Sequence, residues 1–292
     1  MNDKVSVIMP FYNGSIPLLQ RALKSVEELH YKNKEIVLVD DGSDMGVSLV
    51  DVVSECNLTT PNTVIVHTQN RGIAAARNTA ISNATGEWLM WLDCDDTLEV
   101  DCIGRLINEA VNALMVIGEC YVHEGINTFL RKPAIFFSLA QDYGKTIFDP
   151  MMLNVFSLQP QIVRKSAAIE IGLFDSEYQF AEMTEFFLRF LTHFGLEAIK
   201  TISGAYYHYN RNVSNSVSQN RVMLEQYRMR ALLSYCKCNG ILIDDIVYLG
   251  RSDNTGTQVY APIRDGTRIL APYTHVSQNS LRIGGYNYGN KN

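Results

Sequence analysis

The sequence predicts an α/β fold in which a Rossmann-like, mostly parallel sheet is flanked by helices. Two observations predict this class. Short runs of apolar, often β-branched residues alternate with helical hydrophobic patterns through the first half of the chain, and such alternation is typical of parallel sheets with helices on both faces. Hydrophobic residues also make up 47% of the 292 residues, which is enough for a large buried core.

The expected elements follow in order along the chain. A strand at 5–9 precedes a helix at 17–29, in which leucine, alanine and valine recur at helical spacing. The next predicted strand and helix pairs are 35–39 with 47–53, 63–67 with the alanine-rich 72–84, and 87–92 with 99–113, followed by a strand at 114–118. Further helices are predicted at 184–194 and 220–235. Residues 242–292, rich in Gly, Asn, Thr and Tyr, are expected to form an irregular C-terminal extension.

Charge and composition exclude several classes of protein. The chain carries 25 Lys and Arg against 31 Asp and Glu, a net charge of −6, so nonspecific binding to nucleic acid or anionic membrane is not expected. No apolar run reaches the roughly 18 residues of a membrane-spanning helix, and the first residues do not resemble a secretory signal. The six cysteines are irregularly spaced and are interpreted as reduced thiols. We therefore expect a cytoplasmic protein.

Polar clusters follow four of the predicted strands, at 10–13, 40–43, 69–71 and 93–96. Ligands of open α/β sheets bind at the carboxyl ends of the strands, where these loops emerge. The four clusters are therefore expected to converge on one site.

The last of these clusters contains three carboxylates directly behind an apolar run. Asp93 and Asp95 are two residues apart, so in an extended segment both side chains point to one side, as ligands of Mg²⁺ or Mn²⁺ would. Asp96 has a competing structural interpretation, because Asp96 and Glu99 have the spacing of a helix capping box.

A cation held by few protein ligands usually completes its shell with substrate phosphates. Neither a P-loop nor a G-x-G-x-x-G fingerprint is present in the sequence. Tyr12 offers an aromatic face for a base instead, and Asp40 and Asp41 offer carboxylates for a nucleoside.

Four blocks of sequence occur in a fixed order: V-S-V-I-M-P-F-Y-N, E-I-V-L-V-D-D-G-S, N-R-G-I-A-A-A-R-N and G-E-W-L-M-W-L-D-C-D-D. In this order they resemble the family 2 glycosyltransferases of the GT-A fold, closely over residues 4–115. The resemblance continues more loosely through I-G-L-F-D, E-x-x-E-F-F-L-R and Y-Y-H-Y-N-R. It implies transfer of a sugar from a nucleotide diphosphate donor with inversion at the anomeric carbon.

The resemblance also implies roles for individual residues. Pro10, Tyr12 and Asp41 would bind the nucleoside, and Asp41 would read the base. Arg77 would lie against the nucleotide site, unless it is a helix-face arginine bonded to a neighbouring loop.

Asp93-Cys94-Asp95 would be the D-x-D motif of the family. Asp95 would be the direct metal ligand, and Asp93 would lie near the ribose and the metal. His208 would approach the metal and diphosphate from the second half of the chain; the alternative is a purely structural histidine.

One departure from the family pattern bears on catalysis. Met183 stands where the family carries the aspartate that deprotonates the acceptor, and methionine cannot accept a proton. Glu182 is expected to replace it as the general base, with Glu185 as the second candidate. A surface or capping role is the alternative for Glu185.

These observations together predict a metal-dependent, inverting glycosyltransferase that uses Mn²⁺ or Mg²⁺ and a UDP-sugar. The acceptor would be a hydroxyl of a glycan, a lipid-linked glycan or another glycoconjugate. Two alternatives remain open: a catalytically impaired nucleotide-sugar-binding protein and a nucleotidyltransferase. Residues 1–118 are expected to bind the donor, residues 119–241 to form the acceptor side, and residues 242–292 to contact acceptor or mediate homo-oligomerisation.

Overall fold

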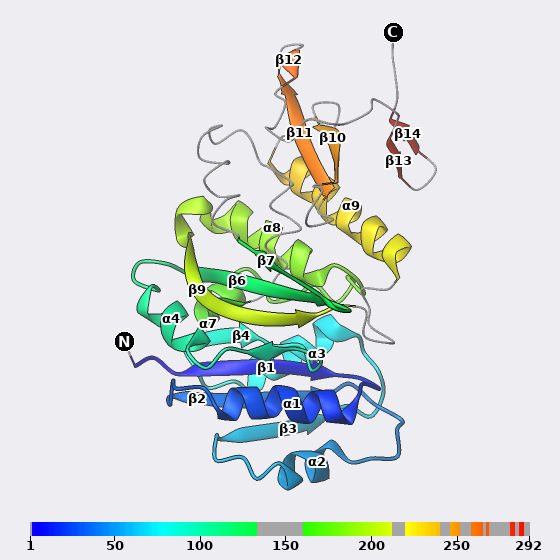
Figure 1. The fold of residues 1–292 in the computed structure, drawn as a ribbon. Coiled ribbons are helices and arrows are strands. Elements are labelled where there is room, and N and C mark those ends of the chain that lie inside the picture. The colour runs from blue at the N-terminus through cyan, green and yellow to red at the C-terminus, as the bar shows by residue number, and fades with distance from the viewer. Residues whose placement is uncertain are drawn as a thin grey trace.

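The computed structural model describes residues 2–132, 160–211 and 220–239, together with the backbone of five short strands between residues 246 and 288. The run I-L-A-P-Y-T-H at 269–275, whose sequence predicts a short strand, lies outside the described residues. The first half of the chain forms the predicted parallel sheet (Figure 1). Its strands β1 to β4 lie in the order β3-β2-β1-β4 and are all parallel. Their bounds are Val5–Phe11, Lys34–Asp40, Asn62–Val66 and Trp88–Trp91.

The sheet continues into the second half of the chain. Strand β8 (Gln161–Arg164) runs antiparallel between β4 and β6 (Met115–Glu124), and β9 (Ile199–Asn210) pairs in parallel with β6. The short β5 (Thr97–Leu98) and the hairpin strand β7 (Asn127–Arg131) pair antiparallel with β9 and β6.

Strand β6 is longer than the predicted strand at 114–118. It passes through Gly118, where a Cβ atom would lie 2.5 Å from the carbonyl oxygen of Ala205 on β9. Glycine thus lets the two strands approach closely at this point. The expected boundary at residue 118 falls inside this strand, so the two halves of the chain share one sheet.

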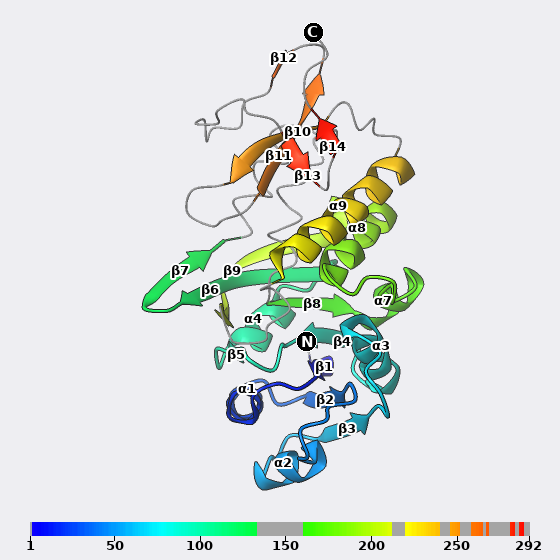
Figure 2. The same ribbon diagram turned by 90° about the vertical axis from the view of Figure 1, so that its right-hand side faces the viewer.

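Helices cover both faces of the sheet, as predicted (Figure 2). One face carries α1, α2 and α4, with bounds Ile16–Glu27, Leu49–Glu55 and Cys102–Asn108. The other carries α3, α7 and α8, with bounds Ile73–Asn83, Lys165–Glu170 and Glu182–Phe194. Helix α9 (Arg221–Cys238) packs on α8. Each face therefore has its own apolar cluster, one rich in leucine and valine and the other rich in alanine and phenylalanine.

The helix predicted at 99–113 is shorter than expected. It begins at Cys102 with Asp101 at the N-cap position, so the capping box expected from Asp96 and Glu99 is wrong. The backbone N–H of Glu99 instead donates to the carbonyl of Tyr206 on β9. Pairing with β9 thus reaches Glu99, which the local pattern had assigned to the helix.

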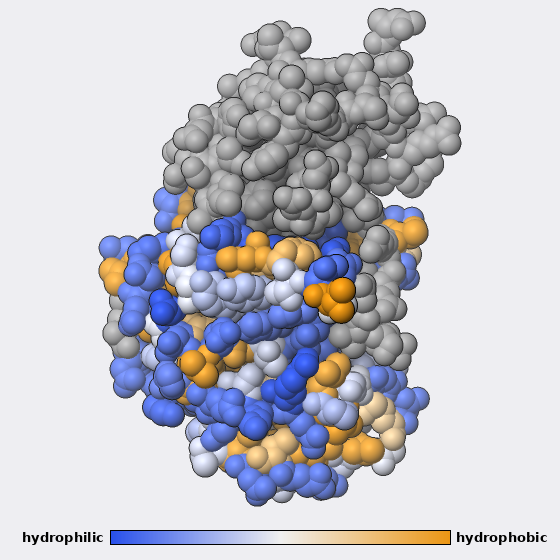
Figure 3. Space-filling view, in the orientation of Figure 1, coloured by the Kyte–Doolittle hydropathy of each residue, from blue (hydrophilic) through white to orange (hydrophobic). Residues whose placement is uncertain are grey.

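The C-terminal extension contains two small antiparallel units. Strands β10 (Ile246–Arg251), β11 (Gln258–Arg264) and β12 (Thr267–Arg268) form one, and β13 (Leu281–Ile283) pairs with β14 (Tyr286–Tyr288). No described helix is long and apolar enough to cross a membrane. On the face seen in Figure 3, the described surface is largely hydrophilic, and hydrophobic residues gather towards the end that carries α2 and β3.

Candidate active site

Hydrogen bonds join the loop after β1 to the loop after β2. The backbone N–H of Asn13 donates to Ser43 Oγ at 2.9 Å, and the N–H of Asp44 donates to Asn13 Oδ1 at 3.0 Å. Asn13 adopts a left-handed conformation, with φ 46°, which asparagine tolerates better than most residues. The adjacent Tyr12 remains 50% exposed. The structure thus leaves an aromatic ring free at the strand ends, where the sequence predicted a nucleoside contact next to Pro10.

Asp41 connects the loops after β2 and β3. Its buried carboxylate accepts from the N–H groups of Arg71 and Gly72, and lies 2.6 Å from His67 Nδ1. The neighbouring Gly42 has φ 77°, and a Cβ there would lie 2.4 Å from the backbone of Gln69. The pairing of Asp41 with His67 was not predicted, and base recognition by Asp41 stays a prediction.

Arg77 brings two of the predicted site residues together. Its guanidinium donates through Nη2 to Asp93 Oδ1 at 2.9 Å and through Nη1 to Glu182 Oε1. The Arg77 side chain is only 2% exposed and its guanidinium carbon lies 5.5 Å from the centre of the Phe174 ring. Burial acts to lower the pKa of Arg77, but the charges of Glu182 and Asp93 more than offset it and raise the pKa. A permanently charged arginine therefore links helix α3, the D-x-D turn and helix α8.

The turn that carries the D-x-D motif is fixed to strand β9. The hydroxyl of Tyr207 accepts from the backbone N–H of Asp93 at 3.2 Å and donates to Asp96 Oδ2 at 2.6 Å. Asn210 donates its backbone N–H to Asp96 Oδ1 at 2.7 Å and its side-chain amide to the carbonyl of Asp95 at 2.6 Å. Asp96 is fully buried. Its carboxylate serves this connection, rather than the helix cap that the sequence suggested.

Asp95 lies in a position that disfavours its negative charge. Burial, followed by repulsion from Asp93, raises the pKa of Asp95 to about 6. Its carbonyl accepts from Arg21, but no hydrogen bond or ion pair joins its carboxylate to a basic side chain in the described part of the chain. A cation placed beside Asp93 and Asp95 would relieve this repulsion. Within residues 2–132, 160–211 and 220–239, however, no group of three or more potential ligands forms a ready metal site.

His208 does not join Asp93 and Asp95 in the described structure. Its ring nitrogens lie 2.8 Å from Glu99 Oε1 and 2.8 Å from His123 Nε2. It also stacks on Tyr121, with ring centres 5.4 Å apart. His208 therefore belongs to a hydrogen-bonded chain with His123 and Glu99, which favours the structural alternative, and its approach to a metal stays a prediction.

Helix α8 carries Met183 and both candidate bases, Glu182 and Glu185, but the three side chains lie in different surroundings. Ala181 precedes the helix in a left-handed conformation, φ 56°. Glu182, at the first helical position, points to Arg77 and its side chain is 9% exposed. Met183 is 6% exposed and packs in the apolar cluster of this face. Only Glu182 is therefore held against the D-x-D turn.

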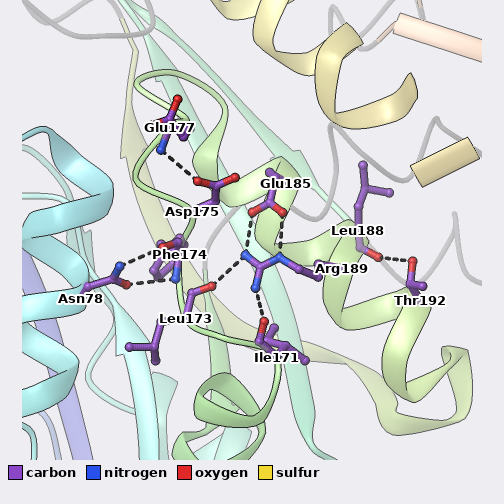
Figure 4. A network of polar contacts seen from close by, with 10 residues as sticks. All are labelled: Asn78, Ile171, Leu173, Phe174, Asp175, Glu177, Glu185, Leu188, Arg189 and Thr192. Carbon is purple, nitrogen blue, oxygen red and sulfur yellow. Dashed lines mark hydrogen bonds and ion pairs between the residues drawn. The ribbon is translucent and has the colours of Figure 1, made fainter. Parts of the chain in front are cut away.

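Glu185 lies in a separate network, shown in Figure 4. Both of its carboxylate oxygens accept from Arg189 at 2.7 Å, and Arg189 also donates to the carbonyls of Ile171 and Leu173. This network binds the turn directly after α7 to helix α8. It favours a structural role for Glu185 over the catalytic alternative.

Solved structures of GT-A glycosyltransferases share the fold of this chain. Residues 1–349 of TarS of S. aureus superpose with a TM-score of 0.56 at 20% identity, over 81% of this chain and 74% of that 1–349 chain. The mannosyltransferase PcManGT of Pyrobaculum calidifontis, solved with GDP-Man and Mn²⁺, has a TM-score of 0.60 at 19% identity, over 80% and 64% of the two chains. The predicted fold is thereby confirmed.

Sequence comparison identifies the family. Glycosyltransferase GlyA of Streptococcus pneumoniae is 30% identical over 166 residues, which are 54% of this chain but only 22% of GlyA. Cholesterol galactosyltransferase of Borreliella burgdorferi is 30% identical over 156 residues, 53% of this chain and 43% of that protein. The chain thus spans less than half the length of these relatives. The model of glycosyl transferase family 2 matches residues 6–171, more than half of the chain, and the chain therefore belongs to this family.

Proposed function

We propose that the chain is a metal-dependent, inverting glycosyltransferase that transfers a sugar from a UDP-sugar to an acceptor hydroxyl. The observation that carries the proposal is the bridge made by Arg77. It joins Asp93 of the D-x-D motif to Glu182 of helix α8, at the carboxyl ends of the parallel strands. The carboxylate that would bind the donor and the one that would accept the proton thus bind the same arginine, which supports a role for both in one reaction.

The donor side of the proposal rests on the loops after β1 and β2. The exposed ring of Tyr12, next to Pro10, would stack on the base of the nucleotide. Asp41 would contact the nucleoside or hold the loop that does. TarS has been solved with UDP and with UDP-GlcNAc, and these ligands support a uridine nucleotide. The GDP-Man of PcManGT makes a guanosine donor the competing choice.

The side chains around the D-x-D turn fit a divalent cation. Arg77 supplies one positive charge against the three carboxylates of Asp93, Asp95 and Glu182, so the group has an excess of two negative charges when all are ionised. Carboxylate oxygens are ligands that Mn²⁺ and Mg²⁺ accept, and both ions readily take further ligands from a diphosphate. When bound, the cation would stabilise the negative charge that develops on the departing diphosphate.

Glu182 would act on the acceptor. As the acceptor oxygen bonds to the anomeric carbon from the face opposite the leaving group, the bond from that carbon to the diphosphate breaks and UDP departs. The proton of the acceptor hydroxyl passes to a carboxylate oxygen of Glu182. Arg77 already binds Oε1 of Glu182, so it would fix the direction of the carboxylate and leave Oε2 for the proton.

One observation favours a second candidate function, nucleotide-sugar binding with impaired catalysis. Met183 is packed in the core where the family pattern has an aspartate, and Glu182 is already engaged by Arg77. The nucleotidyltransferase alternative gains no such support, and the family match counts against it.

A donor screen tests the proposal. UDP-sugars and GDP-mannose would be incubated with Mn²⁺ and the purified chain, and release of the nucleoside diphosphate would be measured with and without glycan acceptors. Release of UDP that depends on the metal is expected. Binding of UDP-sugars without any release, across acceptors, would favour the binding protein, and release of pyrophosphate would identify a nucleotidyltransferase.

A further inference from the structure

The D-x-D turn receives its hydrogen bonds from residues far away in the sequence. Tyr207 and Asn210 both lie near the end of β9, more than 100 residues after the turn. The ring of Tyr207 is 1% exposed and packs in the apolar cluster on the α1 side of the sheet. Its hydroxyl nevertheless forms two hydrogen bonds, one accepted from Asp93 and one donated to Asp96. A buried hydroxyl with two partners fixes both ends of the turn relative to the sheet.

The contacts of Asn210 act on the middle of the same turn. Its amide binds the carbonyl of Asp95 at 2.6 Å, and Arg21 of α1 donates to that carbonyl at 3.0 Å. None of these contacts uses the carboxylates of Asp93 and Asp95. The backbone of the turn is therefore held without using either carboxylate. Oδ1 of Asp93 binds Arg77, which leaves Oδ2 of Asp93 and the Asp95 carboxylate for a ligand.

This arrangement has an electrostatic reason. Asp93 and Asp95 repel one another, and repulsion favours any backbone movement that separates their carboxylates. A turn free to relax would lower this repulsion but would also lose the geometry that a shared cation needs. Fixed backbone contacts prevent the relaxation, so the cation does not have to reorganise the turn when it binds.

We infer that Tyr207 and Asn210 are positioning residues, which hold the backbone of the D-x-D turn so that Asp93 and Asp95 are pre-arranged for a divalent cation and the diphosphate of the donor. The inference rests on the proposed function and names residues of the second half of the chain that serve the same site. It assigns them no contact with substrate; they act through the turn.

Tyr207→Phe tests this assignment, because it removes one hydroxyl and keeps the buried ring. Tyr31→Phe is the matched control: the Tyr31 hydroxyl donates to the carbonyl of Asp3 at 2.5 Å, in another part of the fold. Each variant removes one hydroxyl; Tyr207→Phe loses two hydrogen bonds and Tyr31→Phe loses one, so the larger loss in Tm is expected for Tyr207→Phe. Of the two, only Tyr207→Phe should weaken binding of UDP in the presence of Mn²⁺, by about 5- to 30-fold, the size expected for one or two net hydrogen bonds.

The second readout is rescue by the metal. If the turn is poorly arranged, the apparent Kd of Mn²⁺, followed by its EPR signal, should rise in Tyr207→Phe, and saturating Mn²⁺ should restore most of the UDP affinity. A general loss of folded protein would not respond to Mn²⁺ in this way. If Tyr207→Phe does not fold, Asn210→Ala provides the same measurement from a partly exposed position.

Three outcomes separate the possibilities. Weaker, metal-rescued UDP binding in Tyr207→Phe or Asn210→Ala, but not in Tyr31→Phe, supports the positioning role. Wild-type affinity for Mn²⁺ and UDP in Tyr207→Phe and Asn210→Ala overturns it, while the proposed function stands. If the wild-type chain binds no UDP at any Mn²⁺ concentration, the proposed function fails and this inference falls with it.

Discussion

Replacement of Glu182 by glutamine distinguishes an enzyme from a binding protein. Glutamine keeps the shape of the side chain and an oxygen that can accept from Arg77 Nη1, but it cannot take a proton. If Glu182 is the general base, transfer should fall by about 10²- to 10⁴-fold. Affinity for the donor should change little, because the residues expected to bind it are untouched.

The cost in stability can be worked out from the same contact. The variant exchanges a buried, charge-assisted hydrogen bond between Glu182 and Arg77 for a neutral one, a loss of about 1–2 kcal/mol. In a chain of this size that lowers Tm by roughly 2–8 °C. Assays at 20 °C would therefore still measure folded protein.

Glu185→Gln provides the comparison on the same helix. It weakens a partly buried ion pair with Arg189, whose bonds are both 2.7 Å long, so its effect on Tm should be similar. Steady-state transfer with Mn²⁺ and calorimetric donor binding would be measured for both variants. Full transfer by Glu182→Gln would refute the assignment of the base, and loss of transfer in Glu185→Gln alone would move it to Glu185.

Three further predictions concern the same fold. Asp95→Asn should abolish metal-dependent UDP binding in calorimetry and leave Tm unchanged or higher, because it removes a charge that burial and Asp93 disfavour; unaltered UDP affinity with Mn²⁺ would contradict the assignment. Met183→Asp places a carboxylate among apolar side chains, so it should lower Tm and add no transfer; a gain of transfer in a silent wild type would show that the natural chain is a binding protein. Burial raises the pKa of Glu35, but the bonds from Lys4, Ser6 and Thr85 outweigh it and lower the pKa from 4.5 to about 2. The stabilisation that follows is present above pH 4.5 and is lost as pH falls towards 2, and acid unfolding of Glu35→Gln should lack it.

The first half of the fold could be predicted because its signals are local. Each parallel strand is a short apolar run followed by polar residues, and each following helix has its own hydrophobic spacing. The structure places the predicted strands and helices up to residue 92 within two residues of most expected ends. Strand β8 and the full length of β6 were missed, since their pairing depends on partners distant in the sequence. Local pattern carries no information on such partners.

In the candidate site, too, features set by local sequence could be predicted and features set by distant partners could not. The carboxylates of the D-x-D turn are recognisable from spacing alone, but the role of Asp96 is not. Its spacing to Glu99 fits a helix cap, yet its carboxylate binds Tyr207 and Asn210 of β9. Likewise, Arg77 is separated from Glu182 by 105 residues. A single arginine in an alanine-rich helix is the one local sign that a buried charge needs a partner.

The chain keeps an arrangement around Arg77 that stability alone does not favour. Buried ion pairs are often no more stabilising than apolar residues of the same size, and Arg77 Nε is buried without a hydrogen-bond partner in the described part of the chain. Nearby, repulsion between Asp93 and Asp95 helps to raise the pKa of Asp95 to about 6. An apolar core would avoid both costs. Perturbed, incompletely paired charges at the ends of parallel strands are typical of functional sites, and a divalent cation with a diphosphate would supply the charge and the hydrogen-bond acceptors that this site lacks.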